Sequence, residues 1–146
     1  KTHSYMSKLS SAEISAELES SAAAITAVTG KKVDLFRAPY GDYDDEVINT
    51  AEKDGFYTIQ WDVDSLDWKE QGAEAEIRQV LEHKHLGNGS IILFHNDAKY
   101  TPKVLDTILK GIKEKGFEIV PISQLIHREN FEMDHEGRQI PKGKDV

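Results

Sequence analysis

Four short apolar runs alternate with four helical patterns along this chain of 146 residues, and that alternation constrains the fold more than any other feature. The apolar runs, which we interpret as strands, are residues 33–36, 56–60, 90–94 and 117–120. Helices are predicted from the capping box at 10–13 to Gly30, from Asp44 or Asp45 to Gly55, over 73–86, and from Thr101 to Gly116. Strands that are apolar throughout and alternate with helices predict an α/β fold with a parallel sheet covered by helices.

Polar side chains gather directly after three of the predicted strands. Residues 37–43 follow the first strand, residues 61–68 follow the second, and residues 95–97 follow the third. Both tryptophans and three aspartates of the chain lie within 61–68. The carboxyl ends of parallel strands share one edge of a sheet, where functional sites of such folds lie. The sequence therefore predicts a site that combines an arginine, aspartates, a histidine and an aromatic wall.

Among these residues, His95 is the main candidate for a catalytic side chain. A single histidine at a strand end is more often a structural group than a catalyst, but this one shares its predicted edge with Asp64 and Asp67. An Asp–His pair holds the imidazole in one tautomer and stabilises its protonated form, which a general acid near neutral pH requires. Arg37, otherwise a surface charge, is placed to clamp a carboxylate or an anionic transition state. Asp62 receives no role.

Composition narrows the range of partners. The net charge of −8 argues against a nucleic-acid groove or an anionic membrane surface, and no apolar run is long enough to span a membrane. No glycine-rich phosphate loop follows any strand, so a nucleotide site is not predicted. The absence of cysteine excludes disulfides and thiolate metal sites, and it suits an extracytoplasmic setting. No signal peptide is visible at Lys1 and there is no initiator Met, so we expect a processed form or a fragment.

Three motifs resemble, in order and spacing, those of a known family. They are Phe36-Arg37-Ala38-Pro39-Tyr40-Gly41, Asp64-Ser65-Leu66-Asp67-Trp68 and Leu93-Phe94-His95. They look like the third, fourth and fifth motifs of the polysaccharide deacetylases, the NodB-homology domain of carbohydrate esterase family 4. The resemblance covers about residues 3–126 and implies the parallel sheet of a distorted (β/α) barrel, incomplete in this chain. It also implies metal-dependent hydrolysis of N-acetyl groups from an N-acetylglucosamine-containing polysaccharide, either chitin-like or peptidoglycan.

The resemblance implies a catalytic role for four residues. Arg37 would hold the catalytic base, and the backbone N–H of Tyr40 would help to stabilise the oxyanion. Asp67 would tune His95, the general acid that protonates the leaving amine.

Substrate binding and the metal follow from the same resemblance. Pro39, Trp68 and Leu93 would bind the substrate, with Trp68 and Leu93 lining the acetyl pocket. Zinc or another divalent metal would polarise the carbonyl and activate a water. The aspartates of 61–68 alone suggest a carboxylate metal site, but the resemblance makes Asp67 a partner of His95 and Asp64 a support for the loop.

Two motifs of the family are missing or incomplete. No Thr-Phe-Asp-Asp-Gly-like run, which would carry the base and one metal ligand, occurs in the sequence. Residues 3–10 resemble the continuation of the second motif, with His3 as a metal ligand and the first histidine of that motif before Lys1. A zinc site normally needs three protein ligands, so we expect this chain alone to bind zinc weakly and to have little activity. We also expect it to pair with a missing N-terminal piece or to self-associate as a dimer.

The predicted organisation is a C-terminal part of the catalytic domain over residues 1–126 and a polar tail, mobile or laid down as a strap, over 127–146. One rival hypothesis is a non-catalytic carbohydrate-binding remnant in which Tyr40, Tyr43 and Trp68 stack on sugars. Another is an unrelated flavodoxin-like module whose loops bind a small anion. The polysaccharide substrate class implies an extracytoplasmic location, secreted or associated with the cell wall.

Overall fold

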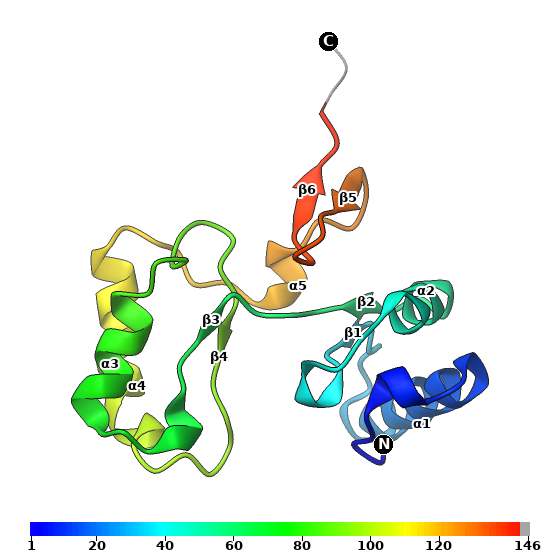
Figure 1. Cartoon of the computed structure of the whole chain (residues 1–146), viewed down its shortest axis with the longest axis horizontal. Helices are drawn as coiled ribbons and strands as arrows, with labels where there is room; N and C mark the ends of the chain where they lie inside the picture. Colours follow the sequence, from blue (N-terminus) through cyan, green and yellow to red (C-terminus); the bar gives the residue numbers. More distant parts are fainter. Residues whose placement is uncertain (144–146) are drawn as a thin grey trace. The chain divides into compact units, whose positions relative to one another are not determined.

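The computed structural model describes residues 1–143 (Figure 1). The chain divides into two compact units, the first spanning Lys1–Gln60 and the second beginning at Trp61. Each unit pairs two short parallel strands, so the predicted α/β class with parallel pairing is confirmed. No helix within the described residues is long and apolar enough to cross a membrane.

The first unit combines two helices with one pair of strands. Its elements are η1 (Met6–Lys8), α1 (Ser11–Thr29), β1 (Leu35–Phe36), η2 (Pro39–Gly41), α2 (Asp45–Lys53) and β2 (Tyr57–Thr58). β1 and β2 are parallel, with Leu35 opposite Tyr57. α1 packs against α2 around buried apolar side chains, which are Met6, Ile14, Leu18, Ala38, Val47 and Ala51.

Local capping interactions fix the helix ends of this unit as the sequence predicts. The Ser10 backbone N–H donates to Glu13 Oε2 at 2.8 Å, which forms part of the capping box of α1. Gly30 ends α1 in the left-handed conformation, with φ of 69°. Asp44 begins α2 because its carboxylate accepts the Val47 backbone N–H at 2.9 Å.

The second unit has the same kind of core. Its elements are β3 (Val63–Asp64), η3 (Asp67–Lys69), α3 (Ala73–Leu81), β4 (Ile92–Leu93), α4 (Thr101–Glu114), α5 (Ile122–Leu125), β5 (Phe131–Met133) and β6 (Gln139–Pro141). β3 and β4 are parallel, with Asp64 opposite Leu93. α3 and α4 lie side by side (Figure 1) and enclose a buried cluster of Val63, Val80, Val104, Ile108 and Ile112.

Two sequence predictions are wrong in this unit. The helix predicted over 73–86 ends at Leu81, and residues 117–120 do not form a strand. The Phe117 N–H donates to the Ile112 carbonyl, so it closes the end of α4 instead of joining a ladder, and the Phe117 ring packs on the core. An apolar run becomes a strand only when a neighbouring strand accepts its backbone hydrogen bonds, and no strand of residues 1–143 does so here.

The polar segment after His127 contains a hairpin that its aperiodic sequence did not predict. β5 and β6 are antiparallel, with Phe131 opposite Pro141. The Asp134 carboxylate accepts the backbone N–H groups of Glu136 and Arg138, each at 2.8 Å, and this closes the turn.

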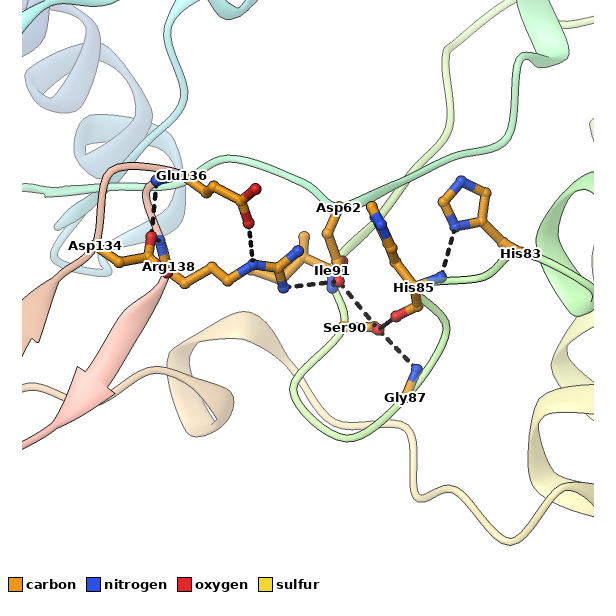
Figure 2. Close-up of polar contacts among 9 residues, drawn as sticks. All are labelled: Asp62, His83, His85, Gly87, Ser90, Ile91, Asp134, Glu136 and Arg138. Carbon is orange, nitrogen blue, oxygen red and sulfur yellow. Dashed lines mark hydrogen bonds and ion pairs between the residues drawn. The ribbon is translucent and has the colours of Figure 1, made fainter.

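The hairpin is tied to the start of β3 by charge (Figure 2). Arg138 Nη1 lies 3.5 Å from Asp62 Oδ2, and its Nε donates to Glu136 at 3.1 Å. Asp62 also accepts the Ile91 backbone N–H at 2.9 Å, so this aspartate links the hairpin to the segment before β4. Because the Arg138 side chain is 43% exposed, the ion pair adds little stability.

Truncation of Ile108 tests the packing of α4. Ile108 is fully buried, so Ile108→Ala removes apolar contacts and leaves a cavity that should cost about 2–5 kcal/mol of unfolding free energy. The same substitution at Ile119, which is 44% exposed, should cost no more than about 1 kcal/mol. Urea denaturation of both variants measures the difference, and equal losses would contradict the described core.

Candidate active site

A buried carboxylate, Asp67, is the centre of the candidate site in the second unit. Its Oδ1 lies 2.7 Å from His95 Nδ1, and its Oδ2 accepts the His95 backbone N–H at 2.8 Å. The hydroxyl oxygen of Thr101 lies 3.1 Å from the same Oδ2. Asp67 begins η3, His95 follows β4 and Thr101 begins α4, so three elements meet at one side chain.

The balance of burial and hydrogen bonding decides the charge of Asp67. Burial alone would raise its pKa, but hydrogen bonds from the His95 backbone, the His95 ring and the Thr101 hydroxyl outweigh it and leave the pKa below its ordinary value. Asp67 is therefore ionised at neutral pH and acts as an acceptor. The shared proton then sits on His95 Nδ1, which fixes the tautomer of the imidazole.

His95 is buried on one side only. The Asp67 side chain has no exposed surface, whereas the His95 side chain is 39% exposed. Among the described residues, no hydrogen-bond partner occupies His95 Nε2. With Nδ1 held by Asp67, Nε2 is the nitrogen that can exchange a proton with a bound molecule.

The loop that leads to Asp67 is held by two short polar side chains, those of Asp64 and Ser65. Leu66 has a positive φ of 54°, and its N–H donates to Asp64 Oδ1 at 2.9 Å. The Ser65 hydroxyl accepts the Asp67 N–H at 3.3 Å. The structure confirms that Asp64 supports the loop, because this bond stabilises the strained turn that presents Asp67.

The two predicted substrate residues of this unit differ in exposure. Trp68, directly after Asp67, is 57% exposed, and Lys69 Nζ lies 5.2 Å from the centre of its ring. Leu93, in β4, is buried. An exposed aromatic surface next to the Asp67–His95 pair is suited to contact with a sugar face, whereas Leu93 lies in the interior.

The remaining predicted residues lie in the first unit. Arg37 is exposed directly after β1, and Pro39 begins η2. Tyr40 has a positive φ of 62° and is 62% exposed, and its ring stacks on Tyr5 at 4.3 Å and meets His3 edge-on at 4.8 Å. Tyrosine in the left-handed region costs backbone strain, and such strain often marks a functional loop.

The described residues do not make a metal centre by themselves. No group of three or more His, Asp or Glu side chains in residues 1–143 is arranged to hold a metal ion. His3, the predicted ligand, contacts the Tyr40 ring. Because a zinc site normally uses at least three protein ligands, this donor set does not fit the metal that the resemblance implies.

Sequence analysis missed two members of the network, Thr101 and Glu76. Thr101 was interpreted only as a helix start, and Glu76 received no role. Both are buried, and Thr101 Oγ1 lies 2.7 Å from Glu76 Oε1. The signal was present, since Glu76 lies four residues before Val80 and next to Ile77, on the apolar face of its helix.

Comparisons with known proteins agree with this fold. A family model described as "Polysaccharide deacetylase" matches residues 1–59. The chain is 34% identical over 123 residues to the peptidoglycan-N-acetylglucosamine deacetylase PgdA of Listeria monocytogenes. The aligned region covers 84% of this chain and 25% of that protein.

Two solved structures are also similar. A family 4 carbohydrate esterase pseudoenzyme from Bacillus anthracis matches with a TM-score of 0.78 at 35% identity, over 85% of this chain and 43% of that one. A family 4 carbohydrate esterase from Streptomyces lividans, solved with acetate, matches with a TM-score of 0.76 at 29% identity, over 97% of this chain and 67% of that one.

The fold is that of a NodB-type α/β domain. In sequence and in structure, the chain is similar to the polysaccharide deacetylases of carbohydrate esterase family 4. It spans about a quarter of the length of the first curated relatives that it matches.

The charge of Asp67 predicts a pH dependence of stability. Its folded pKa is lower than the unfolded value of about 3.9, so the ionised group stabilises the fold above about pH 4, and this contribution is lost as the pH falls through the folded pKa. The difference in unfolding free energy between wild type and Asp67→Asn should therefore shrink as the pH falls from about 5 to below 4. Asp106→Asn, at a side chain 78% exposed, serves as the control. A difference independent of pH would contradict the assigned charge.

Proposed function

We propose that this chain contributes the general-acid part of a deacetylase that removes N-acetyl groups from an N-acetylglucosamine-containing polysaccharide, chitin-like or peptidoglycan. The observation that carries the proposal is the buried Asp67 carboxylate held 2.7 Å from Nδ1 of the half-exposed His95. The family supports the reaction class, and the name of the Listeria relative supports a cell-wall sugar. An extracytoplasmic location goes with that substrate.

The proposed reaction is hydrolysis of an amide. The oxygen of water bonds to the acetyl carbonyl carbon, and the C–N bond then breaks. The leaving nitrogen takes a proton from His95 Nε2, and acetate and a free amine are the products. Protonation is required because an unprotonated amine anion is a poor leaving group, and Asp67 stabilises the imidazolium that supplies the proton.

The other residues have proposed roles that follow the family resemblance. Arg37 holds the base that takes a proton from water, and the Tyr40 N–H helps to stabilise the oxyanion. Pro39, Trp68 and Leu93 contribute to substrate binding. The base is a carboxylate that the sequence motifs of this chain do not supply.

Metal dependence is part of the proposal, although the described donors do not complete a centre. A divalent metal such as zinc would supply Lewis-acid polarisation of the acetyl carbonyl. His3 would be one ligand, and the others would come from outside the described residues.

A non-catalytic carbohydrate-binding domain is the second candidate. It is favoured by the likeness to the Bacillus anthracis pseudoenzyme and by the exposed rings of Tyr40 and Trp68. In that case the aromatic rings stack on sugars and no acetate is released.

Replacement of His95 tests the catalytic role. In the full-length protein, His95→Ala should lower the rate of acetate release from acetylated chito-oligosaccharide by about 10²–10⁴-fold, because the leaving amine loses its proton donor. His85→Ala, an exposed histidine of the same unit, should leave the rate unchanged. Unchanged turnover in the His95 variant would remove it from the mechanism. Oligosaccharide binding without acetate release by the wild type would select the second candidate.

Zinc binding by the 146-residue chain alone tests the donor set. Because His3 lacks two further ligands among the described residues, isothermal titration should give a Kd weaker than about 1 μM. Submicromolar binding by the monomeric chain would contradict this expectation. If such binding disappeared in His3→Ala, the metal would be assigned to His3 and its neighbours.

A further inference from the structure

A second acidic side chain, Glu76, lies behind the Asp67–His95 pair. Glu76 is on α3 and is 5% exposed, and its Oε1 lies 2.7 Å from Thr101 Oγ1. The same hydroxyl oxygen lies 3.1 Å from Asp67 Oδ2. A continuous chain of contacts thus runs from Glu76 through Thr101 and Asp67 to His95.

The number of available protons limits how these contacts can be made. Thr101 has one hydroxyl proton, so it can donate to only one of the two carboxyl groups. If both were ionised, the other contact would bring two acceptor oxygens together. The second oxygen of Glu76, Oε2, is also buried without a hydrogen-bond partner in the described part of the chain, and a charge in that position would be costly.

One arrangement satisfies both contacts. Glu76 carries a proton and donates it to the Thr101 oxygen, Thr101 donates its own proton to Asp67, and Asp67 accepts from His95. Thr101 donation to Asp67 is also one of the hydrogen bonds that lower the pKa of Asp67. The direction of every hydrogen bond in the chain is then fixed.

We propose that Glu76, in its neutral form, is a positioning residue for the general acid His95, acting through Thr101 and Asp67. The catalytic meaning of this inference rests on the proposed function. The structural role of Glu76 is independent of that function, because a fixed Thr101 donor holds the Asp67 carboxyl in the orientation that accepts His95 Nδ1–H. Asp67 and His95 are the ionisable partners of Glu76 in this network. The nearby cation Lys99 is not a member, because it pairs with Glu70 at 3.7 Å in an exposed position.

Two substitutions at Glu76 distinguish a role as a hydrogen-bond donor from a role as a negative charge. Glu76→Gln keeps the shape and an N–H donor toward Thr101, whereas Glu76→Leu removes the donor. In the full-length protein, Glu76→Leu should lower kcat roughly tenfold and leave KM within about twofold, because the acid is misplaced while the substrate surface is intact. Glu76→Gln should retain most of kcat.

The ¹⁵N spectrum of the His95 imidazole gives a readout that does not depend on turnover. Wild type and Glu76→Gln should show a single tautomer protonated at Nδ1, and Glu76→Leu should show a mixture of tautomers. Val80→Ala, a buried truncation on the same helix, is the packing control: it should lower the unfolding free energy and leave the His95 spectrum unchanged. The His95 signals are assigned by their loss in His95→Ala.

Substitutions at Thr101 keep the test decisive if Glu76→Leu does not fold. Thr101→Val should reproduce the tautomer mixture, and Thr101→Ser should retain the wild-type spectrum. An unchanged His95 spectrum in both Glu76→Leu and Thr101→Val would overturn the inference, as would a Glu76→Gln variant as impaired as Glu76→Leu. Full activity of His95→Ala would instead overturn the proposed function, and the spectra would still decide the positioning role.

Discussion

A single buried carboxylate organises the second unit of this protein. The Asp67 side chain has no exposed surface, and a charge in that position is tolerated only if hydrogen bonds replace the lost water. The donors come from His95, two residues after β4, and from Thr101, the first residue of α4. The need to satisfy one aspartate therefore determines where His95 lies and how α4 begins.

The loop that carries Asp67 is strained for the same reason. Leu66 and Glu70, on either side of η3, both have positive φ values, which non-glycine residues seldom adopt. The Asp64 carboxylate offsets part of that cost at Leu66, and the Gln79 side chain donates to the Asp64 carbonyl at 3.0 Å. The strain is concentrated beside the proposed acid, where it aims Asp67 into the interior and leaves Trp68 in solvent.

How much of the fold the sequence predicts depends on how local each signal is. The capping box at Ser10 and the left-handed Gly30 are decided within a few residues, and both ends of α1 were predicted correctly. Strands depend on distant partners. Residues 117–120 have the composition of a strand, but their first N–H is used to close α4. The hairpin around Asp134 was missed because each of its strands has only 3 residues and its stability comes from a turn and one cross-strand ladder.

The candidate site shows the same division between features set by local sequence and features set by distant contacts. An aspartate near His95, either Asp64 or Asp67, was predicted because parallel strands bring their carboxyl ends together, which is a property of the fold and not of the local sequence. The family resemblance selected Asp67. Thr101 and Glu76 were not assigned, because a threonine at a helix start and a glutamate on a helix have ordinary explanations that need no site. Only the packing of α3 against α4 brings the Glu76 carboxyl and the Thr101 hydroxyl into one chain of contacts with Asp67.

The gradient of exposure across this network is what a proton donor needs. Glu76 and Asp67 lie in the interior, where water does not compete for their hydrogen bonds, and His95 carries the last link to a half-exposed ring. If Asp67 were exposed, solvent would weaken its hold on Nδ1. If His95 were fully buried, its Nε2 could not reach a substrate. The proposed metal and base, by contrast, require donors that the described residues do not assemble, so the proposed acid is the part of the chemistry whose local environment the described residues complete.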